Sequence, residues 1–276
     1  MLRWVRCSCS GNAGSTTRCS TCTCSPDNSF SGSLAANSIA TFALVGNAVF
    51  LTQYLQSVVG YTPFVAALWS LAPSVVVGAA APVAGALGQQ FDRAAVMAGG
   101  FLVAAAGFLV LTQVTAQSTV AIALIGAGAL STGLVAVMTL VTEIAMGTME
   151  PAKAGSAAAV LETGAEFGGA LGIAVLGSIG AAIYAGRMAV AIPAGIPDEA
   201  SAVARETLAR ATVVSAQLPG EIGAALLADA RDAFTAGMHG VGMVGALLML
   251  GAAVLCALSL RGAAVVGPDR SAEPPA

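Results

Sequence analysis

The sequence predicts an all-α protein that crosses a membrane several times. Hydrophobic residues make up 57% of the 276 residues and charged residues only 9%, whereas an ordinary soluble domain carries about 25% charged residues. Gly164, Gly168 and Gly172 recur at every fourth position inside one long apolar segment. This spacing lets two membrane helices pack closely, but it would destabilise a helix in water.

Six apolar segments are long enough, or nearly so, to cross a bilayer as helices. They are apolar on all sides, unlike the surface helices of soluble proteins, which have one polar face. The predicted spans are Leu34–Val59, Pro63–Leu87, Ala94–Thr112, Thr119–Thr142, Ala154–Tyr184 and Phe234–Leu260.

The basic residues of the short links predict the orientation of these spans. If the six spans alternate in direction, the following residues fall on one side: Arg93, Lys153, Arg261 and Arg270. Short cytoplasmic loops are enriched in Lys and Arg, so this side is predicted to be cytoplasmic. The long link 185–233 then lies outside the cell. Within it, Asp198–Gln217 and Glu221–Ala233 are predicted to form short surface helices, because each starts with acidic residues and follows a proline.

Residues 1–28 differ in composition from the rest of the chain. They hold five of the six cysteines among Ser, Thr, Gly and Arg. The Cys19 and Cys22 pair suits zinc, but together with Cys7 and Cys9 it fits no common ligand spacing. We therefore expect a low-complexity segment that is disordered or translated out of frame, with no metal site. Residues 29–262 would form the membrane domain, and 263–276 a cytoplasmic tail.

Other motifs exclude several classes of protein. Gly240, Gly242 and Gly245 match a dinucleotide-binding pattern, but no strand precedes them, so helix packing is the better interpretation. The chain has one lysine and no basic stripe, which argues against nucleic-acid binding. Its single histidine, His239, has no nucleophile pattern beside it. We predict neither an enzyme nor a bound cofactor.

The first span carries a polar stripe on about half of its circumference. Such a stripe faces a water-filled cavity or a bundle interior, and hydrogen bonding between helices is the alternative explanation. The candidates for a substrate pathway are Asn37, Thr41, Thr52, Gln53 and Gln56.

The fifth span carries two carboxylates, Glu162 and Glu166, one turn apart and roughly opposite the glycine ridge. Measured from Ala154, helical rise places them about 12 Å and about 18 Å along the axis. A carboxylate at this depth is a candidate for proton or cation coupling. The alternative is a structural pair with the amides of the first span, or carboxylates that extend toward the membrane surface.

Several stretches resemble one transporter family. The segments 151–157, Leu161–Gly164 and Phe167–Ala174 resemble the penultimate helix of the fourteen-span drug:proton antiporters, a branch of the major facilitator superfamily. Gln53–Gln56 and then Gly60–Pro63 look like the start of that family's C-terminal half. The resemblance implies that the six spans form one half of a major facilitator superfamily bundle.

The resemblance also implies a function. Gly85, Asp92 and Arg93 match the superfamily's cytoplasmic loop after the second helix of a half, although Gln89 and Gln90 stand where Asp and Arg are usual. The implied protein is the C-terminal half of a proton-coupled antiporter in a bacterial inner membrane. It would export small hydrophobic or cationic substrates, and it would be inactive without the N-terminal half or a second copy. The alternative is a self-contained, six-span structural or interaction protein that works as a dimer.

Overall fold

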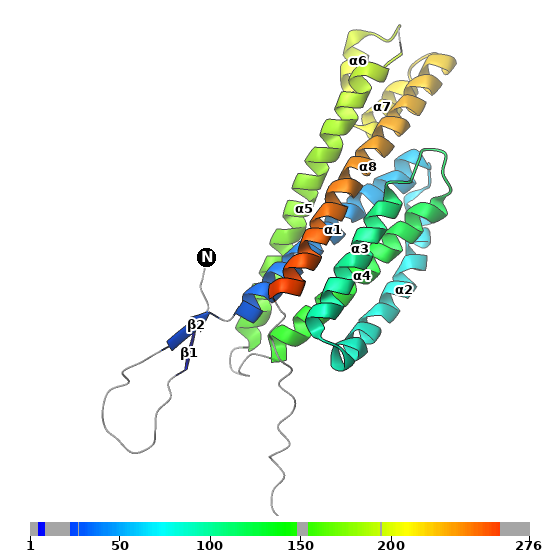
Figure 1. Ribbon diagram of the computed structural model, residues 1–276. Coiled ribbons are helices and arrows are strands. Elements are labelled where there is room, and N and C mark those ends of the chain that lie inside the picture. The colour runs from blue at the N-terminus through cyan, green and yellow to red at the C-terminus, as the bar shows by residue number, and fades with distance from the viewer. Residues whose placement is uncertain (1–4, 9–22, 27, 148–153, 194, 260–276) are drawn as a thin grey trace, which may run out of the picture.

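The computed structural model describes residues 5–8, 23–26, 28–147, 154–193 and 195–259, and six long helices dominate it (Figure 1). Their bounds are α1 (Asn28–Gln53), continued by the π-helix η1 (Tyr54–Val58), α2 (Pro63–Gln90), α3 (Arg93–Leu111), α4 (Val120–Gly147), α5 (Ala154–Ala191) and α8 (Gly220–Ser259). Two short helices, α6 (Asp198–Ala204) and α7 (Leu208–Ser215), lie between α5 and α8.

Among the residues that the structure describes, six helices have the length and apolar composition needed to cross a membrane. Each corresponds to one of the six predicted spans, so the predicted fold class, a helical membrane protein with six spans, is confirmed. Consecutive long helices run in opposite directions, and α1 begins at the end of the bundle where α8 finishes (Figure 1).

Two tight turns join the first three helices. Gly60 has φ of +85°, a conformation that glycine adopts without strain, in the turn after η1. Thr62 then caps α2 by accepting a hydrogen bond from the Val65 amide at 3.4 Å, and Pro63 occupies the first helical position. Between α2 and α3, the Asp92 carboxylate accepts from the Ala94 amide at 3.2 Å. Both turns can be predicted from the sequence, because they use residues typical of tight turns and helix starts.

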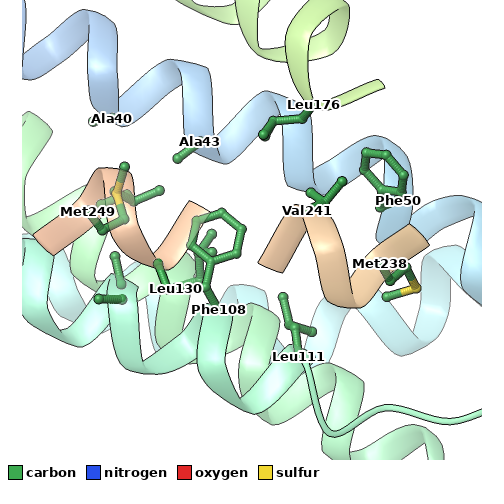
Figure 2. Packing of buried hydrophobic residues seen from close by; sticks show 14 of the residues in the cluster. Ala40, Ala43, Phe50, Phe108, Leu111, Leu130, Leu176, Met238, Val241 and Met249 are labelled. Carbon is green, nitrogen blue, oxygen red and sulfur yellow. The ribbon is translucent and has the colours of Figure 1, made fainter. Parts of the chain in front are cut away.

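The bundle is built on two close helix pairs, α3 with α4 and α1 with α5, and α8 packs against α3 and α5. Figure 2 shows the centre of this packing, where Phe108 and Leu130 lie on one side of α8 and Ala40 and Ala43 on the other. Phe108, Leu130 and Ala40 are fully buried. By contrast, α2 packs mainly against α4 and lies at the edge of the bundle (Figure 1). Most of its large apolar side chains are exposed.

The last two long helices extend further than the sequence predicts. α5 has 38 residues and α8 has 40, which at helical rise is about 57 Å and about 60 Å, against about 30 Å for a bilayer core. The segment Glu221–Ala233, predicted to be a separate surface helix, is instead the start of α8. In Figure 1 the shared extension of α5 and α8 continues past the other helices and carries α6 and α7 at its end.

The α6–α7 segment is attached to this extension by defined contacts. The Tyr184 hydroxyl of α5 donates a hydrogen bond to the Ala204 carbonyl at the end of α6, at 2.9 Å. Leu208, Ala211 and Val214 of α7 are buried, and α7 packs against α8. The segment is therefore a packed cap, which we call the α6–α7 cap (residues 198–215), and not a loose loop.

Before α1, two short strands, β1 (Val5–Ser8) and β2 (Thr23–Pro26), pair antiparallel with Cys7 opposite Cys24. The predicted disorder or frame shift of residues 1–28 stays a prediction. The remaining N-terminal cysteines and the predicted tail 263–276 lie outside the described residues, as do Lys153, Arg261 and Arg270.

Candidate functional site

The α1–α5 interface depends on the three ridge glycines. A Cβ added at Gly168 would overlap the carbonyl oxygen of Ser38, and one at Gly172 would overlap that of Phe42. At Gly164 it would lie 2.6 Å from the Leu34 side chain. Because two of these neighbours are backbone atoms, the helices approach so closely that no side chain fits between them.

The two carboxylates lie on the other side of the same helix. Glu162 and Glu166 are exposed, as is Thr163 between them, whereas Gly168 is buried against α1. No described helix covers them, although their sequence positions are inside the apolar part of α5. A carboxylate in lipid is costly, so this side of α5 needs water or another protein surface against it.

The polar stripe of α1 is divided between two environments. Asn37 and Thr41 are buried; the Asn37 side-chain amide donates to the Leu161 carbonyl of α5 at 3.2 Å, and the Thr41 hydroxyl donates to the Asn37 carbonyl at 2.7 Å. Thr52 and Gln53 are exposed, and Gln56 is half-buried in η1. For Asn37 and Thr41 the structure shows hydrogen bonding within and between helices, which is the alternative explanation. Thr52 and Gln53, at the end of α1, are the open part of the stripe.

Of the three predicted cytoplasmic loop residues, Gly85 is close to a carboxylate that the sequence does not single out. Gly85 is buried, and a Cβ there would lie 3.0 Å from Oε1 of Glu143 in α4. Asp92 caps α3, and Arg93 is exposed. Glu143 is half-buried. Only the contact between α2 and α4 reveals its position beside Gly85, because the two residues are far apart in the sequence.

The remaining motif residues take part in helix packing or contact the backbone. Gly242 and Gly245 of α8 pack against α3, where added Cβ atoms would lie 2.9 Å from the Thr112 side chain and 2.6 Å from the Phe108 ring. This agrees with helix packing and not with a dinucleotide site. His239 is half-buried and its Nε2 lies 2.6 Å from the Val114 carbonyl. Within the described ranges, no group of three His, Cys, Asp or Glu side chains is arranged to hold a metal ion.

The fold and this surface define a polytopic helical membrane protein in which one apolar helix exposes two carboxylates. No family model matches the chain. It is similar to curated bacterial proteins: it is 32% identical over 232 residues to the multidrug efflux pump LfrA of Mycolicibacterium smegmatis, covering 84% of this chain and 46% of that protein. It is 31% identical over 201 residues to the methyl viologen resistance protein SmvA of Salmonella typhimurium, covering 71% and 39%. It is 29% identical over 197 residues to the multidrug resistance protein Stp of Mycobacterium tuberculosis, covering 71% and 36%.

These relatives are named as efflux and resistance proteins, and none of the three is named as an enzyme. The chain is therefore related to bacterial membrane transporters. It spans less than half the length of each of the three.

Proposed function

We propose that this chain forms the C-terminal, six-helix half of a proton-coupled efflux antiporter of the major facilitator superfamily, in its fourteen-span branch. The observation that carries the proposal is the uncovered side of α5, where Glu162 and Glu166 are exposed inside an apolar span. A second six-helix half packed near this side would supply the protein or aqueous surface that these carboxylates need. The relatives support the proposal, since each of the three is more than twice as long as the segment it shares with this chain.

The division of the helices supports a transport pathway between two halves. α1 and α5 are fixed to each other by the glycine interface, so they would move as one rigid wall. Transporters of this type bind substrate between their halves and rock one half against the other. The open surface of this wall includes the exposed Thr52 and Gln53 of α1 and the exposed carboxylates of α5. We infer that small hydrophobic or cationic substrates and protons use this side, in the inner membrane of a bacterial cell.

The test is uncoupler-sensitive drug efflux in cells that express residues 29–262 fused behind the N-terminal half of the M. smegmatis relative. Glu166→Gln is nearly isosteric but cannot release a proton. We expect it to abolish efflux driven by the proton gradient while leaving membrane yield unchanged. Glu221→Gln is the matched control, because Glu221 is exposed in the first turn of α8, outside the apolar part of that helix. Full efflux by Glu166→Gln would remove the proton-coupling role.

The same side of α5 also supports one alternative, a dimer of this chain. A second copy of this chain could cover the same side of α5 and so form a structural or interaction dimer. In that case the fused protein would show no efflux, and the purified chain would be a dimer whose association weakens when Glu162 and Glu166 are both replaced by Gln.

A further inference from the structure

A cavity of about 270 Å³ lies at the outer end of the α1–α5 wall. Four parts of the chain line it: α1, α5, α8 at Phe234, and residues 206–208 at the junction of α6 and α7 in the cap. Ligand pockets in proteins usually measure about 300–1,000 Å³, so the cavity suits a compact molecule. It lies near the end of α1 and beside the middle of α5, whereas Glu162 and Glu166 are closer to the start of α5.

Three aromatic side chains, each from a different long helix, line the cavity. Phe50 comes from α1, Tyr184 from α5 and Phe234 from α8. The rings of Phe50 and Phe234 have centroids 6.2 Å apart and are tilted by 37°. Gly180 allows this arrangement, because a Cβ at that position would lie 2.6 Å from the Phe50 ring. Tyr184 is also held in place, since its hydroxyl donates to the Ala204 carbonyl of the cap.

One charged side chain completes the cavity wall. Glu206, from the cap, is the only charged residue among the described residues that line it, and Gln53 of α1 supplies an amide. Glu206 pairs with Arg210 at 2.7 Å, but the two side chains are 54% and 56% exposed. A pair so exposed to water is weak, so the carboxylate remains available to a competing cation. Aromatic faces attract cations as well.

We propose that this cavity binds a planar aromatic cation, with Glu206 as its charge partner and Phe50, Tyr184 and Phe234 as its ring contacts. The α6–α7 cap is then part of a ligand-binding site and more than a connection between two spans. The inference rests on the proposed efflux function only for the role of the ligand, which would be a substrate held at the outer mouth of the pathway. Binding itself requires only this chain.

The test is fluorescence titration of the purified full chain in detergent with two matched probes. N-Methylphenanthridinium carries a fixed positive charge, and phenanthridine has the same ring system but is neutral at pH 7.5. We expect saturable binding of the cation, and weaker binding of the neutral probe. Glu206→Gln should weaken cation binding about two- to fivefold and leave the neutral probe unchanged. Arg210→Gln, which frees Glu206, should strengthen cation binding by a similar factor. Glu199→Gln in α6 is the charge control, because Glu199 is exposed and does not line the cavity.

A second variant tests the cavity without using charge. Gly177 lines it, and a Cβ at this position would meet no atom within 4 Å, so Gly177→Leu should fill the space without moving a helix. It should abolish saturable binding of both probes, whereas Gly251→Leu, at an equally open helical glycine away from the cavity, should bind like wild type. The proposal is overturned if the wild-type chain shows no saturable binding, if Gly177→Leu binds normally, or if Glu206→Gln leaves the preference for the cation unchanged. Loss of efflux in the fused protein with intact probe binding would count against the proposed function and not against this site.

Discussion

Gly168 is a residue at which the α1–α5 interface tolerates little change. Any side chain there meets the backbone of Ser38 and not a movable side chain. We expect Gly168→Leu to lower the stability of the bundle by about 1–3 kcal/mol or more, because the two helices would have to separate. The measurement is the thermal unfolding midpoint of the protein purified in detergent, together with its yield in the membrane.

The matched control is Gly251→Leu, since a Cβ at Gly251 meets no atom within 4 Å. Both substitutions replace a helical glycine with the same large side chain, so they share any change in helix propensity. Equal yields and equal unfolding midpoints for the two variants would contradict the close packing of α1 on α5.

Single residues also show which features of the structure can be predicted from the sequence. The regular spacing of Gly164, Gly168 and Gly172 is a local pattern, and the structure places these residues at a close helix contact. The position of Glu162 and Glu166 on the opposite side of α5 can be predicted from the same helical periodicity. The cavity residues Tyr184 and Phe234 could not be predicted in this way. They are in different helices, and only the packing of those helices brings them together.

Among the elements, the α6–α7 cap is attached to α5 by the Tyr184 hydrogen bond and to α8 by the packing of α7. Tyr184→Phe removes the donor to the Ala204 carbonyl and keeps the ring. We expect this substitution to destabilise the attachment of the cap by about 1 kcal/mol. The check is limited proteolysis with trypsin, because Arg205 and Arg210 are exposed in the cap. Cleavage there should become several-fold faster.

Tyr61→Phe is the control for that experiment, since the Tyr61 ring stacks on Trp69, far from the cap in sequence, and the substitution keeps the ring. If Tyr184→Phe and Tyr61→Phe are cleaved at the wild-type rate, the hydrogen bond does not hold the cap in place.

Two elements show why the sequence prediction was incomplete. The charged start of α8 resembles a surface helix, because Glu221, Asp229 and Asp232 interrupt the apolar pattern. In the structure it is nonetheless continuous with the last span, since a helix does not have to end where its apolar composition does. The polar stripe of α1 follows from helical periodicity, but periodicity alone does not say which part of it α5 covers. The Asn37 contact with Leu161 shows that the inner part is covered.

For the whole molecule, the orientation of the six spans is the first prediction to test. The cap should lie outside the cell and the α2–α3 turn inside. In a variant whose native cysteines are replaced, Ala209→Cys in the cap should react with a membrane-impermeant maleimide added to intact cells. Gln90→Cys at the end of α2 should react only after the membrane is opened. Both positions are exposed in the structure. If only Gln90→Cys were labelled in intact cells, the orientation of the six spans would be the opposite of the one predicted.

The central claim is that this chain supplies one wall of a pathway that needs two. The measurement that tests it most directly compares uncoupler-sensitive drug efflux by the 276-residue chain alone with efflux by residues 29–262 joined to a complementary N-terminal half. We predict no efflux by the chain alone, because a single half has no partner to rock against, and efflux by the joined protein that collapses with the proton gradient. Robust, uncoupler-sensitive efflux by the chain alone as a monomer would contradict the account.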